Sequence, residues 1–251
     1  MSRLILGLQP VREAVRARGA DLERVLIERN SGDRLDGVRR FAEDRGARVE
    51  IVTRAELDRL AGGVRHQGVA AIAKDLGLAR IEDLDTGPEC LVVALDGVMD
   101  PQNFGAVIRS AVALGATAVV WAEHASAPLT PATFRASAGA VEHARLCRVP
   151  SLPSALDLLQ QRGVTAVALD GQGDRDLDAV DLRGPVALVV GAEDKGSRRS
   201  VRRACSVIAR LPMHGPIASL NASVAGALAV YEVQRQRRAA RSSIPPATRD
   251  A

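Results

Sequence analysis

Residues 209–232 read ARLPMHGPIASLNASVAGALAVYE, and this stretch predicts how the C-terminal part of the chain folds. An apolar strand over 207–211 is followed by a loop over 212–217 that holds two prolines and one glycine. Ser219 and Asn221 then stand at the start of a long helix of small residues, where unpaired backbone N–H groups can bind an anion or an electron-rich ligand. A simple N-cap role for Ser219 or Asn221 is the alternative.

Two earlier segments also place polar side chains between a strand and a helix. In LDGVMDPQNFGAVIRSA, residues 95–111, Asn103 stands where a helix starts, either as its N-cap or as a functional group. Arg109 follows among apolar neighbours, which predicts a partly buried charge that needs a partner; a solvated helix residue is the alternative.

The second of these segments is LVVGAEDKGSRR, residues 188–199, in which Gly191 and Gly196 frame Glu193. A glycine at the end of a strand lets a ligand approach the backbone closely. Ser197 stands where a phosphate-binding P-loop needs lysine, and no G-x-G-x-x-G occurs, so neither of these nucleotide fingerprints is present.

The chain alternates strands and helices in two series, which predicts an α/β protein with two domains. Residues 1–75 form a small α/β unit, and residues 76–89, with an acidic cluster, a glycine and a proline, are interpreted as a linker. The strands of residues 90–240 are continuous apolar runs, which are typical of a parallel sheet covered on both faces by helices. Residues 241–251 are predicted to be a disordered tail.

Composition excludes some classes of protein. The net charge is +4, and of the 34 basic residues only Lys74 and Lys195 are lysine, which suits a phosphate-bearing partner without proving one. Three cysteines without C-x-x-C spacing predict free thiols in the cytoplasm and no metal site. Neither a signal peptide nor a membrane span is expected.

At this point the three polar segments together resemble the signature motifs of the SpoU-type methyltransferases of the SPOUT superfamily. The first resembles N-x-G-A-x-x-R-(S/T)-A over 103–111, the second G-x-E-x-x-G over 191–196, and the third P-M-x-G-x-x-x-S-L-N-x-S-x-A over 212–225. The N-terminal unit resembles the L30e-like RNA-binding domain of the bacterial ribosomal-RNA guanosine 2′-O-methyltransferases, including its closing His66-Gln67-Gly68. The resemblance covers the chain to about Arg238.

The resemblance implies a fold, a cofactor and an assembly. The fold is a SPOUT α/β domain with a C-terminal trefoil knot behind the L30e-like domain, and the assembly is a homodimer through the knotted domain. The methyl donor is S-adenosylmethionine, which Gly191, Leu211 and Leu220 contact by family position. The implied active-site residues are Asn103, Arg109, Glu193, Ser219 and Asn221.

The resemblance also implies roles for these side chains. The resemblance makes Arg109 the candidate for helping the proton of the ribose 2′-hydroxyl to leave. Free Arg109 is a poor base for this step, because a guanidinium stays protonated. We therefore expect it to stabilise developing alkoxide charge and grip an RNA phosphate, with Glu193 holding Arg109 or a loop in place. Ser219 and Asn221 would orient the donor and the ribose.

Ribosomal RNA is the expected partner, as free 23S RNA or as a pre-ribosomal particle. RNA contacts are predicted for Arg135 and for Arg198, Arg199 and Arg202 of a basic helix, whose alternative is a solvated face. The resemblance implies methyl transfer from S-adenosylmethionine to the ribose 2′-hydroxyl of a guanosine in 23S RNA. Methylation of transfer RNA, and a non-catalytic RNA-binding assembly factor with the same fold, are the alternative functions. The Asp-rich loop 171–183 has no assigned role.

Overall fold

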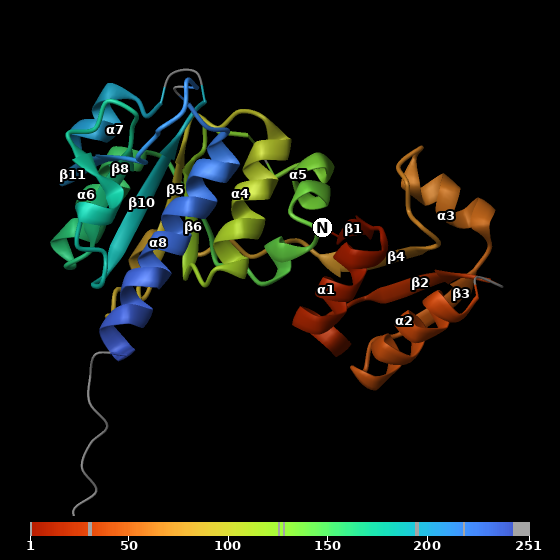
Figure 1. Ribbon diagram of the computed structural model, residues 1–251. Coiled ribbons are helices and arrows are strands. Elements are labelled where there is room, and N and C mark those ends of the chain that lie inside the picture. Colours follow the sequence, from red (N-terminus) through yellow and green to blue (C-terminus); the bar gives the residue numbers. More distant parts are fainter. Residues whose placement is uncertain are drawn as a thin grey trace, which may run out of the picture. The chain divides into compact units, whose positions relative to one another are not determined.

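The computed structural model describes residues 2–29, 32–124, 126–127, 129–193, 196–217 and 219–242 (Figure 1). Its contacts group into two compact units. The first unit comprises Met1–Gly77 and Leu129–Ala144, and the second comprises Leu78–Pro128 and Arg145–Ala251. The N-terminal unit thus includes a segment that the sequence assigned to the second domain.

The first unit is built on a four-stranded mixed sheet of order β1-β4-β2-β3. Its strands are β1 (Ser2–Leu6), β2 (Arg24–Glu28), β3 (Val49–Val52) and β4 (Val69–Lys74). Its helices are α1 (Leu8–Arg18), η1 (Gly19–Asp21), α2 (Asp33–Asp44) and α3 (Arg54–Ala61). Strand β1, which the sequence interpretation did not assign, pairs antiparallel with β4. The apolar face of α1, with Val11, Ala14 and Val15, is buried.

The segment 129–144 belongs to the first unit because of a buried carboxylate. It holds α5 (Pro131–Ala136) and η3 (Ala140–Glu142). The side chain of Glu142 is 1% exposed and accepts hydrogen bonds from Arg3 Nη2 at 2.5 Å and Arg18 Nε at 2.7 Å. A buried carboxylate requires such partners, so this ion pair fixes the segment to α1 and β1.

The second unit has a seven-stranded sheet of order β7-β6-β5-β10-β8-β11-β9, and every recorded pairing in it is parallel, as predicted. The strands are β5 (Leu91–Asp96), β6 (Ala118–Ala122), β7 (Leu146–Val149), β8 (Thr165–Leu169), β9 (Arg175–Asp176), β10 (Val186–Gly191) and β11 (Val207–Arg210). The helices are η2 (Ile81–Asp83), α4 (Pro101–Ala113), α6 (Leu152–Gln161), η4 (Leu177–Ala179), α7 (Arg199–Arg203) and α8 (Ala222–Ser242).

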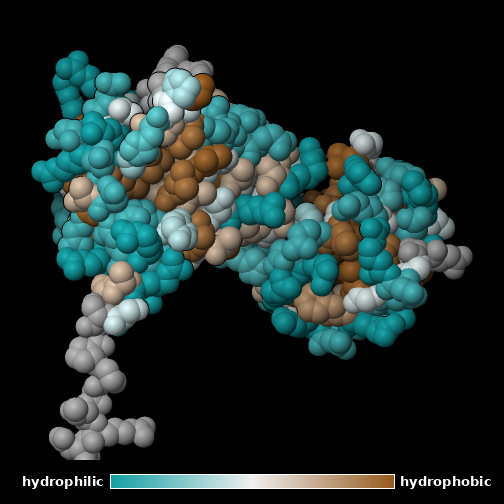
Figure 2. All heavy atoms as spheres, in the orientation of Figure 1, coloured by the Kyte–Doolittle hydropathy of each residue, from teal (hydrophilic) through white to brown (hydrophobic). Residues whose placement is uncertain are grey.

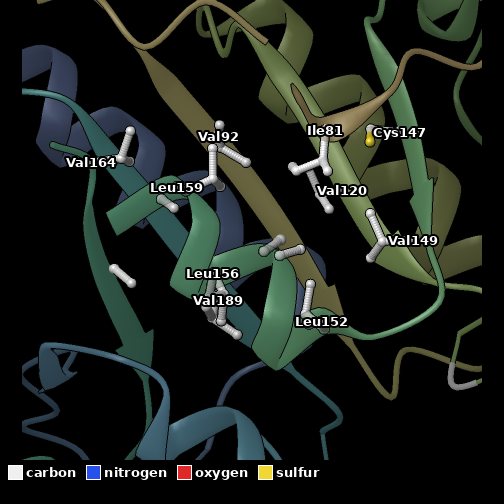
Figure 3. Packing of buried hydrophobic residues seen from close by; sticks show 14 of the residues in the cluster. Ile81, Val92, Val120, Cys147, Val149, Leu152, Leu156, Leu159, Val164 and Val189 are labelled. Carbon is white, nitrogen blue, oxygen red and sulfur yellow. The ribbon is translucent and has the colours of Figure 1, made fainter. Parts of the chain in front are cut away.

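Helices cover both faces of this sheet. On one face, the strands contribute Val92, Val120 and Val189, which pack against Leu152, Leu156 and Leu159 of α6 (Figure 3). On the other face, α4 and α8 pack together, and α8 lies on β10. Gly226 of α8 approaches Val190 so closely that a Cβ there would be 3.3 Å from Val190 Cγ2. The neighbouring residues Val189 and Val190 of β10 therefore pack against helices on opposite faces of the sheet, α6 and α8.

Two segments that the sequence interpretation left as connections contain ordered, buried structure. In the expected linker 76–89, Ile81 and Leu84 are buried in the core of the second unit. Arg162 donates to the carbonyl oxygens of Glu82 at 3.0 Å and Leu84 at 2.7 Å. In the Asp-rich loop 171–183, β9 extends the sheet edge beside β11 and is followed by η4, in which Leu177 is buried.

The C-terminal helix is anchored near its end by Arg237, whose side chain is 3% exposed. Its guanidinium donates to the carbonyl oxygens of Glu89, Cys90 and Gly184 at 2.8–2.9 Å. The helix extends to Ser242, so residues 241–242, which were expected to belong to the disordered tail, are helical, and the rest of that tail lies outside the described residues. The trefoil knot stays a prediction.

Candidate active site

Polar groups gather at the carboxyl edge of the seven-stranded sheet, where parallel α/β sheets bind ligands. Strands β5 and β10 are direct neighbours and end at Asp96 and Gly191. The loop after β10 holds Glu193, and the segment after β11 leads to Asn221. The three polar segments therefore converge at one sheet edge.

Asn103, Glu193 and Asn221 form a closed hydrogen-bonded cluster, one residue from each segment. Asn103 Nδ2 donates to Glu193 Oε1 at 2.8 Å, and Asn221 Nδ2 donates to Asn103 Oδ1 at 3.0 Å. Asn221 Nδ2 also donates to Glu193 Oε1. Because an ionised carboxylate only accepts, Glu193 fixes which way both amides point.

The cluster also contains the start of α8. The backbone N–H of Ala222 donates to Glu193 Oε1 at 3.1 Å, and that of Ser223 donates to Asn221 Oδ1 at 2.9 Å. Asn221 is thus both the N-cap of α8 and a member of the cluster. A carboxylate beside the N-terminus of a helix is stabilised by the positive end of the helix dipole.

Asn103 is not the N-cap of α4, which was the simpler interpretation of that residue. The cap is Asp100, whose carboxylate accepts from the N–H of Gln102 at 3.1 Å and of Asn103 at 3.2 Å. Pro101 occupies the first helical position, where its missing N–H costs nothing. The side chain of Asn103 is therefore free to join the cluster.

A pocket of about 360 Å³ lies beside the cluster, which is within the usual size range of small-molecule sites. Its lining includes Gly191, Leu211 and Leu220, the three residues expected to contact the methyl donor, together with Glu193 and Ser219. The remaining lining residues are Leu169, Asp170, Gly171, Gln172, Val190, Ala192, Gly196, Arg202, Met213, Ala222 and Ala225.

Gly191 has a steric reason to be glycine. A Cβ there would lie 2.2 Å from the carbonyl carbon of Gly196 and 2.3 Å from the nitrogen of Ser197. Ala192 and Gly196 exchange backbone hydrogen bonds at 3.2 and 2.8 Å, which closes the loop on itself. The backbone at the end of β10 therefore forms part of the pocket wall. Asp194 and Lys195 lie outside the described residues.

Arg109 differs from its prediction. Its side chain is exposed on α4 instead of partly buried, and within the described part of the chain no carboxylate or carbonyl is bonded to it. Among the described residues no ion pair joins Glu193 to Arg109, which was one of the two expected roles of Glu193; its Oε1 accepts from Asn103, Asn221 and Ala222 instead. The reason is geometric: residues 103 and 109 are six apart on a helix and project in different directions.

The basic helix α7 is tied to two aspartates that the sequence interpretation missed. Asp96, which is fully buried, accepts from Arg198 Nε and from its backbone N–H, both at 2.6 Å. Asp170 accepts from Arg202 Nη1 at 2.9 Å. The signal was present as an aspartate after each apolar run, in LVVALD and TAVALD.

Of the four arginines predicted to contact RNA, two form these ion pairs and two do not. The guanidinium groups of Arg198 and Arg202 are engaged by carboxylates, although the Arg198 side chain is itself 48% exposed. Arg199 on α7 and Arg135 on α5 are exposed, and within the described residues neither forms an ion pair. All four roles stay predictions.

The three cysteines are free thiols. Burial raises the pKa of Cys147 to about 11 and that of Cys205 to about 12, so both are protonated near neutral pH.

Among the described residues, no three histidine, cysteine or acidic side chains gather in a way that could hold a metal ion. In that same part of the chain, no helix is long and apolar enough to cross a membrane.

Two family models match the chain. Residues 90–231 match the SpoU rRNA Methylase family, and residues 4–78 match the RNA 2′-O ribose methyltransferase substrate binding family. The chain is 39% identical over 239 residues to the 23S rRNA (guanosine-2′-O-)-methyltransferase RlmB of Xylella fastidiosa, covering 93% of this chain and 96% of that protein. It is 38% identical to an uncharacterized tRNA/rRNA methyltransferase of Mycolicibacterium vanbaalenii, covering 95% and 78%.

Solved structures are similar over most of the chain. The SpoU methyltransferase AviRb of Streptomyces viridochromogenes, in complex with AdoMet, aligns with a TM-score of 0.79 at 27% identity, covering 94% of this chain and 91% of that one. An RNA 2′-O ribose methyltransferase aligns with a TM-score of 0.77 at 31% identity, covering 94% and 89%.

Proposed function

Because the chain belongs to the SpoU rRNA methylase family, whose model matches residues 90–231, we propose that it methylates the ribose 2′-hydroxyl of a guanosine in 23S ribosomal RNA. S-adenosylmethionine is the methyl donor. The observation that carries the proposal is the cluster of Asn103, Glu193 and Asn221 beside a pocket lined by Gly191, Leu211 and Leu220. The choice of 23S guanosine follows the relative in Xylella fastidiosa.

The pocket residues fit the donor. The backbone at Gly191 has no side chain between it and the pocket, and Leu211 and Leu220 add apolar surface. When bound there, the sulfonium supplies an electrophilic methyl group. The protein's part is to align the acceptor oxygen with that methyl group, and alignment alone can be worth several kcal/mol.

Ser219 and Asn221 are the residues proposed to orient the ribose. Ser219 is exposed in the pocket lining, and Asn221 is fixed by Glu193 and the start of α8. Glu193 is thus a positioning residue for the two amides, where either Arg109 or a loop was expected to be its partner. Exposed Arg109 is left to bind a group of the RNA, such as the phosphate beside the reacting hydroxyl.

We also propose that the protein is a homodimer through the C-terminal domain. Val224, Leu228 and Tyr231 of α8 are 46%, 45% and 48% exposed and follow one another at helical spacing. Figure 2 shows hydrophobic residues along this helix. A row of exposed apolar side chains on a helix is typical of an interaction surface. The knot would place this helix at the dimer interface.

The N-terminal domain, matched over 4–78, is proposed to bind the RNA. The choice of ribosomal RNA over transfer RNA follows the relative in Xylella fastidiosa. We expect the protein to act in the cytoplasm, on free 23S RNA or on a precursor particle. An RNA-binding assembly factor without catalysis is the competing function.

The experiment is transfer of tritium from labelled S-adenosylmethionine to unmodified 23S RNA, with the position mapped by the alkali resistance of the 2′-O-methylated linkage. Incorporation at one guanosine, abolished by Arg109→Ala, establishes enzyme, substrate and site. Incorporation into transfer RNA alone corrects the substrate. Tight RNA binding without incorporation into any RNA or precursor particle leaves the assembly factor.

A further inference from the structure

A second and larger hollow lies in the first unit. Its volume is about 680 Å³. It is lined by the end of β2, the first turn of α2, the outer side of α3 and the loop after α3, with the residues Glu28, Arg34, Leu35, Arg54, Asp58, Gly63, Val64, Arg65, His66, Gln67 and Gly68. The hollow is large enough for a nucleotide, and no residue role assigned so far uses it.

The wall formed by His66 is rigid. The side chain is 7% exposed. Its Nδ1 accepts the backbone N–H of Gly68 at 3.0 Å, so the proton of the neutral ring is on Nε2, which donates to Asp58 Oδ1 at 2.9 Å. His66 therefore holds the turn together and also fixes one carboxylate at the edge of the hollow.

The turn itself has little freedom to collapse into the hollow. Gln67 and Gly68 both have positive φ angles, 58° and 81°. Gln67 Oε1 accepts the N–H of Leu8 at 2.9 Å. A Cβ on Gly68 would lie 2.6 Å from Leu35 Cδ1 and 3.0 Å from Glu28 Oε2, so the backbone of the turn packs directly against these two lining residues of the hollow. The hollow is preformed, which lowers the entropic cost of binding.

The charges around the hollow are mixed. Arg34, Arg54 and Arg65 contribute guanidinium groups, and Glu28 and Asp58 contribute carboxylates. Arg54 Nε lies 3.8 Å from Asp58 Oδ2. In the described ranges no ion pair engages Arg34 or Arg65, so their guanidinium groups are available to an anion.

A bare anion does not account for the two carboxylates, because like charges at short range repel. A nucleotide accounts for both kinds of group: guanidinium groups suit its phosphate, and carboxylates accept hydrogen bonds from the amino groups of bases. Proteins bind sequence-specific RNA mainly through unstacked bases in such pockets.

We propose that this hollow binds one unstacked nucleotide of the substrate RNA, with its phosphate against Arg34 and Arg65 and the amino group of its base against Glu28. The base is then adenine, cytosine or guanine, since uracil has no amino group. The proposal rests on the proposed function for the identity of the RNA, but the binding site stands on the first unit alone.

The phosphate contacts are tested with Arg34→Ala and Arg65→Ala, against Arg40→Ala as the matched control. Arg40 is exposed on the same helix as Arg34, does not line the hollow, and its loss changes the net charge equally. With unmodified 23S RNA as substrate, each hollow variant should raise KM about tenfold at unchanged kcat and reduce the salt dependence of RNA binding by about one phosphate contact. Thermal unfolding should stay as in the wild type. A KM as in Arg40→Ala overturns the phosphate contact.

The base contact is tested by Glu28→Gln, with fluorescent oligoadenylate, oligocytidylate and oligouridylate as probes. The wild type should bind the first two several-fold more tightly than oligouridylate, and Glu28→Gln should reduce that preference. Equal binding of all three by the wild type overturns the base contact. These binding measurements need no turnover, so they still decide the site if the wild type methylates no RNA, which would refute the proposed function instead.

Discussion

Asn103 Nδ2 and Glu193 Oε1 lie 2.8 Å apart, so a side chain from the first turn of α4 is held by the loop after β10. Asn221, at the start of α8, closes the cluster with both. Three segments that are far apart in the sequence thus form one hydrogen-bonded unit. Substitution of Glu193 should therefore disturb all three segments, because Glu193 Oε1 is the acceptor that Asn103 and Asn221 share.

We expect Glu193→Ala to lower methyl transfer about a hundredfold, since misplacement of reacting groups by about 1 Å has that effect. The free energy of unfolding should fall by only about 1 kcal/mol, because Glu193 is exposed and water can replace it as acceptor. Single-turnover transfer and urea unfolding measure the two effects. Glu123→Ala, which removes another exposed acid of this unit, is the control. Full activity of Glu193→Ala would contradict the positioning role.

Arg109→Ala should abolish methyl transfer and leave binding of S-adenosylmethionine unchanged, because Arg109 does not line the donor pocket. Arg109→Lys should retain part of the activity if positive charge is what the reaction needs. Complete loss in Arg109→Lys with intact RNA binding would indicate that the forked guanidinium geometry is required.

Calorimetry with the donor and single-turnover kinetics give the two readouts for Arg109. Gln102→Ala, another exposed position on the same helix, is the control and should behave as the wild type. Arg109→Ala with wild-type turnover would remove Arg109 from the site.

Leu228→Glu should convert the homodimer to a monomer. The substitution places a charge in the middle of the row formed by Val224, Leu228 and Tyr231, and burial of an unpaired charge at an interface is unfavourable. Sedimentation equilibrium measures the mass. Ala239→Glu, an exposed position three turns further along α8, should leave the mass unchanged. A monomeric wild type, or a dimeric Leu228→Glu, would refute this interface.

Several elements could be predicted from the sequence because their signals are local. Apolar runs such as LVVALD and PVALVVG predict buried parallel strands, and β5 and β10 are fully paired parallel neighbours. Likewise, polar residues placed after strand ends predict convergence, because all parallel strands end at the same sheet edge. The cluster of Asn103, Glu193 and Asn221 is one consequence.

Other features depend on partners far away in the sequence. Glu142 joins the segment 129–144 to the first unit through Arg3, which is 139 residues away. Asp96 binds Arg198 across 102 residues, so the composition of the basic helix could not reveal which arginines are engaged. The exposure of Arg109 could not be seen either, because apolar neighbours in a helix do not specify which way one side chain projects.

Arg237→Met should lower the free energy of unfolding by about 3 kcal/mol. Its guanidinium donates to the carbonyl oxygens of Glu89, Cys90 and Gly184, and the substitution removes all three of these charge-assisted hydrogen bonds, although Cys90 O still accepts from the N–H of Val186 at 3.0 Å. Urea unfolding measures the change. Arg238→Met, the exposed neighbour, should change stability by less than about 0.5 kcal/mol. Equal effects of the two would show that the carbonyl contacts contribute little.

The buried thiol of Cys147 predicts a loss of stability at alkaline pH. Burial raises its pKa from 9.0 to about 11, so the folded protein keeps this proton where the unfolded chain releases it. The stability that this thiol contributes is therefore complete below pH 9 and is lost as the pH rises toward 11. The slope from one such group approaches about 1.4 kcal/mol per pH unit.

Other groups titrate in this range, so the measurement is the difference between the wild type and Cys147→Ala in urea unfolding from pH 8 to pH 10.5. The wild type should lose stability more steeply than the variant, whatever the variant's stability at pH 8. Parallel curves would mean that Cys147 ionises equally in the folded and unfolded chains.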